Sequence, residues 1–133
     1  MTSLVVDTQS IIWFLAQSAQ LSNTARGAIQ DAITAGNPVY VSVITIVEIV
    51  YLVEKGRFAQ DVLDDLVDVL QRPDSGIQLF PLDLEIASDL HLVPRTDVPD
   101  MPDRIIGATA VHLGLPLITS DAKLQSSRVA TVW

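Results

Sequence analysis

The chain has 133 residues, 49% of them hydrophobic, and its sixteen acids and eight bases give a formal charge of −8. A chain of this length and apolar content folds around one core, which excludes a disordered protein, a collagen-like fibre and a coiled coil. It contains no cysteine, which excludes disulfides, thiolate nucleophiles and cysteine-ligated metal sites. The acidic balance argues against a broad basic surface for nucleic acid, so any phosphate contact would need a metal ion or a few local bases.

The N-terminal segment does not resemble a secretory signal, because the first basic residue is Arg26. We therefore expect a cytoplasmic protein. The most apolar run covers residues 39–53 and includes Glu48. This run is too short and too polar to span a bilayer, which needs about 20 apolar residues, and we interpret it as buried core.

Apolar blocks alternate with helical patterns along the whole chain, with no repeat or linker that would divide it. The predicted strands cover residues 4–6, 38–43, 77–80, 116–119 and 129–132. The predicted helices cover about 8–17, 23–35, 43–55, 58–71, 83–92 and 102–113, with a proline-rich connection at 94–102. This alternation predicts a single α/β domain over residues 1–133, with a parallel, doubly wound sheet flanked by helices.

Ligands of such sheets bind beyond the carboxyl ends of the strands, near the reversal of strand order. Asp7 directly follows the first strand, and Asp121 lies two residues past the strand at 116–119. Both carboxylates should therefore emerge at the same sheet edge. Taken singly, each aspartate is more simply explained as a helix cap or a turn residue than as a ligand-binding residue.

Glu48 lies in a helical segment that is apolar nearly all round, and a buried carboxylate without a partner is costly. The structural alternative is a salt bridge to a nearby base, or a rim position that reaches water. Ser42 is expected to cap this helix. Thr45 is expected to be an ordinary first-turn residue.

Asp103 is predicted in the first turn of the helix that precedes the fourth strand. Asp100 as the N-cap and Pro102 in the first turn would explain this acid without any chemistry, because the helix dipole favours carboxylates there.

The conjunction of the four acids is more informative than any one of them. Asp7, Glu48, Asp103 and Asp121 come from four separate segments, yet all are predicted near one mouth of the sheet. Two carboxylates about 4 Å apart repel by about 4 kcal/mol at an effective dielectric constant near 20, so the cluster needs a cation. All-oxygen ligation favours Mg²⁺ or Mn²⁺, which can activate water and neutralise a phosphate.

Several other polar residues are interpreted more conservatively. Hydroxyls near the strand ends, at Thr8 and Thr119, would either cap helices or bind phosphate and metal-bound water. Arg104 and Lys123 stand next to two of the acids, and either base would hold a substrate phosphate or merely offset the carboxylates. The acids of the predicted helix over 58–71 are interpreted as a solvated face and both histidines as core-edge or surface residues, at Asp61, Asp64, Asp65, Asp68, His91 and His112.

Three blocks of the sequence resemble the PIN-domain ribonucleases, and within them the VapC-type toxins of VapBC toxin–antitoxin pairs. LVVDTQSIIWFL is similar to the opening strand of the family with its acid, here Asp7. VSVITIVEIVYLVEKGR is similar to the helix that carries the second acid, Glu48. PDRIIGATAVHLGLPLITSD is similar to the closing block with Asp103 and Asp121.

The resemblance implies a five-stranded parallel sheet in the order 3-2-1-4-5, a homodimer, and a small antitoxin whose basic tail blocks the acidic pocket. It also implies a Mg²⁺- or Mn²⁺-dependent endoribonuclease whose four acids hold the ions, and the charge of −8 would suit a basic partner segment. Glu48 or Asp121 would orient the attacking water.

Two other functions fit parts of the same pattern. The first is a non-catalytic PIN-like module that binds RNA or a protein. The second is a phosphoacceptor receiver domain, which also has an acidic metal pocket but requires paired acids after the first strand, where this chain offers only Asp7.

Overall fold

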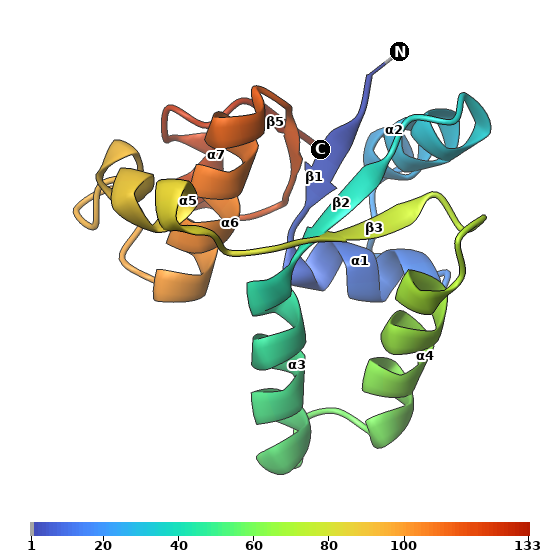
Figure 1. Cartoon of the computed structure of the whole chain (residues 1–133). Coiled ribbons are helices and arrows are strands. Elements are labelled where there is room, and N and C mark those ends of the chain that lie inside the picture. Colours follow the sequence, from blue (N-terminus) through green and yellow to red (C-terminus); the bar gives the residue numbers. More distant parts are fainter. Residues whose placement is uncertain (1) are drawn as a thin grey trace.

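The computed structural model describes residues 2–133, and five parallel strands form its centre (Figure 1). The strand order is β3-β2-β1-β4-β5, and every neighbouring pair is parallel. The predicted doubly wound sheet and its order are thus confirmed. The strand bounds are β1 Leu4–Val6, β2 Val39–Ser42, β3 Ile77–Phe80, β4 Leu117–Ile118 and β5 Thr131–Val132.

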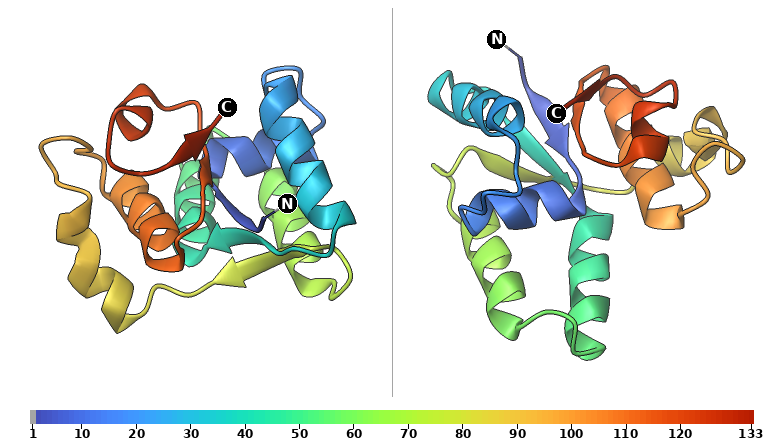
Figure 2. Two further views of the ribbon diagram at one scale, coloured as in Figure 1. Left: turned by 90° about the horizontal axis from the view of Figure 1, so that it is seen from above. Right: turned by 180° about the vertical axis from the view of Figure 1, so that it is seen from behind.

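Helices cover both faces of this sheet. In Figures 1 and 2, α1, α2 and α4 lie on one side and α5, α6 and α7 on the other, while α3 extends away from the end of β2 beside α4. The helix bounds are α1 Thr8–Leu15, α2 Asn23–Thr34, α3 Val43–Glu54, α4 Gln60–Gln71, α5 Leu84–Ser88, the 3-10 turn η1 Asp89–Leu92, α6 Met101–Leu113 and α7 Ala122–Gln125.

The core consists of two hydrophobic clusters, one on each face of the sheet. Side chains of β1 alternate between the two clusters: Leu4 and Val6 belong to one and Val5 to the other. All three side chains are buried, which explains why β1 is apolar at every position. Because β1 is buried on both faces, its carboxyl end holds the next residue, Asp7, in a fixed position.

The strand order reverses between β1 and β4. The chain builds β2 and β3 on one side of β1 and then returns to place β4 and β5 on the other. At this point the Asp7 amide donates to the carbonyl oxygen of Ile118 at 3.1 Å. The first residue after β1 is thereby fixed beside the end of β4, at the place where doubly wound sheets bind ligands.

Several predicted boundaries are wrong by a few residues, for identifiable reasons. The second strand ends at Ser42 because this residue is the N-cap of α3. The Ser42 hydroxyl accepts a hydrogen bond from the Ile44 amide. The expected helix over 58–71 begins at Gln60, because Gly56, at φ +75°, ends α3 and residues 57–58 form a bend before the extended cap residue Ala59.

The expected helix over 83–92 is also wrong, because it divides into α5 and η1. The Arg104 guanidinium donates to the carbonyl oxygens of Leu90 and Val93, at 3.1 and 2.8 Å, and stabilises the tighter turn. The short helix α7 was not predicted. No helix within residues 2–133 combines the length and the apolar character needed to cross a membrane.

Candidate functional site

All four predicted acids line one cavity of about 220 Å³ at the carboxyl end of the sheet, which we call the acidic cavity. They come from the end of β1, from α3, from the first turn of α6 and from the cap of α7. The predicted convergence of four distant segments is therefore present. The complete lining is Asp7, Thr8, Gln9, Glu48, Leu52, Phe58, Asp103, Ser120 and Asp121.

Asp7 is the most deeply placed of the acids, with 7% of its surface exposed. It is the N-cap of α1, and its Oδ1 accepts from the Ser10 amide at 2.9 Å. Burial raises the pKa of Asp7, hydrogen bonds to Ser10 and Thr119 partly oppose this, and the nearby charge of Asp121 raises it further. The Asp7 carboxylate thus caps α1 and also lines the acidic cavity.

Glu48 is held by a short chain of hydroxyl groups. Thr8 Oγ1 donates to Glu48 Oε1, and Thr45 Oγ1 lies 3.0 Å from Thr8 Oγ1. Because the Thr8 hydrogen is used on Glu48, the Thr45 hydroxyl is the donor of the second bond. Thr45 is fully buried, so it is more than an ordinary first-turn residue.

The salt bridge considered for Glu48 is not found among residues 2–133, where the ion pairs lie elsewhere. Burial is the largest effect on Glu48 and raises its pKa, the bond from Thr8 opposes this, and the charges of Asp100 and Asp7 raise it further. Glu48 is thus a half-buried carboxylate surrounded by other acids.

Asp103 is the third residue of α6 and leaves the capping to Asp100, whose Oδ2 accepts from the Asp103 amide at 3.1 Å. The expected cap arrangement is therefore correct, and it frees the Asp103 carboxylate to face the cavity. Burial raises the pKa of Asp103 to about 7, and the charges of Asp100, Asp121, Glu48 and Asp7 contribute in that order.

Asp121 is the N-cap of α7, with Oδ1 accepting from the Leu124 amide at 2.9 Å. Its own amide donates to Thr119 Oγ1 at 3.0 Å, which fixes the turn after β4. Thr119 is fully buried. This predicted supporting residue therefore shapes the loop beneath the acids rather than facing the cavity.

The two predicted supporting bases have different surroundings. Arg104 uses its guanidinium on the carbonyl oxygens of Leu90 and Val93, so it neither offsets the acids by an ion pair nor lines the acidic cavity. Lys123 is exposed and lines a neighbouring cavity together with Asp103 and Asp121. Of the two, only Lys123 is positioned to contact a ligand of the acids.

The acidic residues set aside during sequence analysis are exposed along α4, at Asp61, Asp64, Asp65 and Asp68. His112 lies 3.7 Å from Glu85, and His91 contacts the carbonyl oxygen of Ser88. Neither histidine lines the acidic cavity.

The donor chemistry of the cavity fits a divalent cation, because its polar lining consists of carboxylates, hydroxyls and the amide of Gln9, which offer the hard oxygen ligands that Mg²⁺ and Mn²⁺ prefer. Within the part of the chain that the structure describes, no three acids or histidines stand close enough to hold one ion as they are. The raised pKa values of three of the acids reflect burial and mutual repulsion, which a bound cation would relieve. The roles of the four acids as metal ligands and catalytic residues stay predictions.

Comparison with known families gives a direct match, since the PIN domain family model covers residues 4–130. The chain belongs to the PIN domain family. Ribonuclease VapC22 of Mycobacterium tuberculosis (strain ATCC 25618 / H37Rv) is 28% identical over 136 residues, covering all of both chains.

Solved structures share the fold at lower identity. The VapBC2 complex of Rickettsia felis, bound to a promoter DNA fragment, has a TM-score of 0.71 and 14% identity, covering 98% of this chain and 97% of that one. A toxin–antitoxin complex from Klebsiella pneumoniae has a TM-score of 0.63 and 22% identity, covering 98% and 96%.

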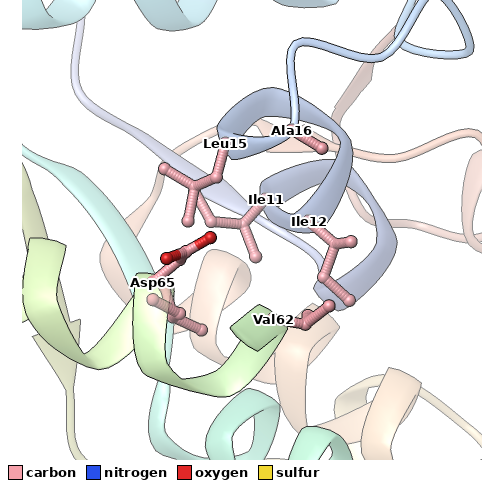
Figure 3. A pocket seen from close by; sticks show the side chains of 7 residues that line it. Ile11, Ile12, Leu15, Ala16, Val62 and Asp65 are labelled. Carbon is pink, nitrogen blue, oxygen red and sulfur yellow. The ribbon is translucent and has the colours of Figure 1, made fainter. Parts of the chain in front are cut away.

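A second hollow of this PIN domain, of about 50 Å³, lies between α1 and α4 (Figure 3). Ile12 and Leu15 of α1 face Val62 of α4 across it, and the carboxylate of Asp65 is directed toward α1. It is mostly apolar and shares no lining residue with the acidic cavity. This hollow could therefore contact an apolar side chain and one positive charge, whereas the clustered carboxylates line the acidic cavity.

Sequence reasoning missed three contributors to the site of this PIN domain. Phe58 was expected to be the first residue of the helix over 58–71, but it lies in the loop before α4 and lines the acidic cavity. Thr45 completes the hydroxyl chain to Glu48. Asp100 adds a fifth negative charge that acts on both Glu48 and Asp103. The cap sequence indicated Asp100, but no local signal indicated the other two.

Proposed function

We propose that this PIN domain is a Mg²⁺- or Mn²⁺-dependent endoribonuclease that hydrolyses RNA phosphodiester bonds with an activated water, and that it is the toxin of a toxin–antitoxin pair. The observation that carries the proposal is the acidic cavity, in which carboxylates from four separate segments meet. Three of them, Asp7, Glu48 and Asp103, have raised pKa values, and none of the four forms an ion pair with a base of residues 2–133. Similarity to Ribonuclease VapC22 supports RNA as the substrate.

A bound divalent ion would lower the pKa of a water molecule and offset the charge of the scissile phosphate. Asp7 and Asp103 would hold the ion from the sheet end and from α6, and Asp121 would contribute from the rim. Thr8 donates to one oxygen of Glu48, and both residues line the acidic cavity. In that position Glu48 would accept the proton of the attacking water while the bond from phosphorus to the leaving oxygen breaks.

The proposed function predicts strict metal dependence. Single-stranded, hairpin and transfer RNAs are incubated with the purified chain in Mg²⁺, in Mn²⁺ and in EDTA. We expect cleavage only with metal, and a loss of at least about 100-fold for Asp7→Asn, the size typical when one group that supports transition-state stabilisation is removed. Asp74→Asn, an exposed acid outside the cavity, is the matched control. Cleavage in EDTA, or full activity of Asp7→Asn, would overturn the proposal.

The same assay addresses the rival function. Inactivity on all three RNA classes, together with tight binding of a partner protein, would favour a non-catalytic module. PIN family membership already argues against a receiver domain.

The proposed partner is an antitoxin with a basic tail that enters the acidic cavity and blocks it. The charge distribution favours this, because the chain carries −8 overall and four acids line the cavity. The hollow between α1 and α4 would take an apolar side chain of the same segment, with Asp65 pairing one of its bases. A short adjacent reading frame encoding a DNA-binding protein with a basic tail would support the pair, and its absence would weaken the toxin role while leaving the nuclease chemistry intact.

A homodimer is also proposed, on the family resemblance and on the exposed apolar face of α3. Val47 and Tyr51 on that face expose 56% and 57% of their surface. A second copy packed there would remove this apolar area from water.

A further inference from the structure

The acidic cavity continues into a second cavity of about 320 Å³ on the far side of Asp103 and Asp121, which line both. The second cavity is bounded by the chain before α6 and by the first turn of α7. We call the two cavities together the cleft. Its remaining lining on the second side is Val98, Pro99, Asp100, Ala122 and Lys123.

Phe58 is the aromatic residue on the first side of the cleft. It is half-buried, yet it is not among the side chains that pack in or against the two hydrophobic clusters of the described chain, unlike Trp13, Phe14, Tyr40, Phe80 and Trp133. The loop that carries it is fixed, because Gly56 adopts φ +75° and the Arg57 amide donates to the carbonyl oxygen of Leu52 at 2.9 Å. An aromatic side chain held outside the core and beside Glu48 offers a flat surface to a ligand of the acids.

Lys123 is the basic residue on the second side. It is exposed, and within residues 2–133 it takes part in no ion pair. The neighbouring Arg104 is committed to backbone carbonyl oxygens, so Lys123 is the base of the described chain that lines the cleft. Its charge lies on the side opposite Phe58, with Asp103 and Asp121 between them.

We propose that a single strand of RNA crosses the cleft. One nucleobase stacks on Phe58, and Lys123 binds a backbone phosphate on the other side of the scissile bond. The proposal rests on the nuclease function above and specifies how its substrate is held. A single strand is required because stacking on a protein side chain needs a base that is free of its helical neighbours. Neither contact reads a base edge, so the strand would be held with little sequence preference at these two points.

The test is binding of a fluorescein-labelled, random-sequence 12-nucleotide RNA to the full chain, with Ca²⁺ in place of Mg²⁺ to slow hydrolysis. Phe58→Ala should raise the dissociation constant about 5- to 150-fold, the range for one lost stacking contact. Phe58→Trp should retain binding, whereas Phe58→Leu, which keeps an apolar side chain in the loop, should not. Thermal unfolding of each variant separates lost binding from lost folding.

Lys123 is tested through salt dependence. Lys123→Gln should weaken binding and reduce the slope of log affinity against log salt by about 0.7, the contribution of one phosphate contact on a single strand. Phe58→Ala should leave that slope unchanged. Arg128→Gln is the matched control, because it removes the same charge from a cavity that shares no residue with the cleft.

The two proposals fail in different ways. A chain that cleaves RNA with Mn²⁺, but whose Phe58→Ala and Lys123→Gln variants bind as tightly as wild type, would overturn the strand path alone. A chain that shows both binding effects, but cleaves no RNA in any metal, would overturn the nuclease function and leave the strand path standing.

Discussion

Replacing Asp103 by asparagine should stabilise the metal-free protein at pH 8, although the residue belongs to the proposed active site. The Asp103 carboxylate is half-buried and is surrounded by Asp100, Asp121, Glu48 and Asp7, which raise its pKa together with burial to about 7. An asparagine has nearly the same shape and carries no charge. The variant therefore removes a repulsive interaction while the capping bond from the Asp103 amide to Asp100 is kept.

The size of this effect follows from the two protonation equilibria. A pKa of about 7 in the folded chain, against an ordinary value of 3.8, corresponds to about 4 kcal/mol in the absence of screening. Because the side chain is half-exposed and solvent screens it, we expect about 1 to 2 kcal/mol. For a chain of this length that gain raises the melting temperature by roughly 3 to 8 °C.

The sign of the pH dependence is also fixed. Between pH 3.8 and about 7 the folded chain keeps the Asp103 proton and the unfolded chain releases it. The free energy of unfolding therefore falls as pH rises through this window, and the loss is complete above pH 7. Asp103→Asn lacks this pH-dependent loss, so the stability of the variant relative to wild type should increase progressively from pH 4 to pH 8.

The assay is thermal unfolding in EDTA at pH 5 and pH 8, with Asp74→Asn as the control for loss of one exposed charge. The control should change stability by less than about 0.5 kcal/mol. The electrostatic reasoning would be refuted if Asp103→Asn were less stable than wild type at pH 8, or if its melting temperature differed from that of wild type by the same amount at both pH values.

Three further predictions concern other parts of the molecule. Thr8→Val removes the hydrogen bond that lowers the pKa of Glu48, so the acid limb of the cleavage rate should move to higher pH; an unmoved profile would exclude Glu48 as the base. Gly107→Val should destabilise the fold by about 1 to 3 kcal/mol in urea unfolding, because even a Cβ there would lie 3.3 Å from Leu124. Tyr51→Asp on the exposed face of α3 should convert a dimer to a monomer in light scattering, and a monomeric wild type would contradict the proposed homodimer.

The strands and their order could be predicted because their signals are local or topological. The strand at 77–80 lies between a glycine turn and Pro81, and its predicted bounds match β3. The last two strands were predicted too long, since each pairs over only two residues, with Leu117 beside Thr131 and Ile118 beside Val132. Their length depends on how far two distant segments run together, which a local pattern does not contain.

The four acids could be predicted to meet because Asp7 and Asp121 follow strand ends, Glu48 lies on the helix after β2, and Asp103 opens the helix that leads into β4. The placement of Phe58 could not, because its spacing to Val62 and Leu66 matches a helical stripe and only the loop after Gly56 sets it apart. Arg104 shows the converse error. Its neighbour in sequence is Asp103, but consecutive residues of a helix point in directions about 100° apart, so it contacts η1.

The uncompensated charge of the acidic cavity links stability, catalysis and inhibition. In the absence of a cation, Asp7, Glu48 and Asp103 all have raised pKa values, so ionising them at neutral pH costs folding energy. A divalent ion and the basic tail of an antitoxin would each recover that energy by supplying positive charge at the same place. Because one cavity of about 220 Å³ would serve both, each should weaken the binding of the other. An antitoxin that uses this cavity would therefore inhibit the enzyme and stabilise it through the same carboxylates.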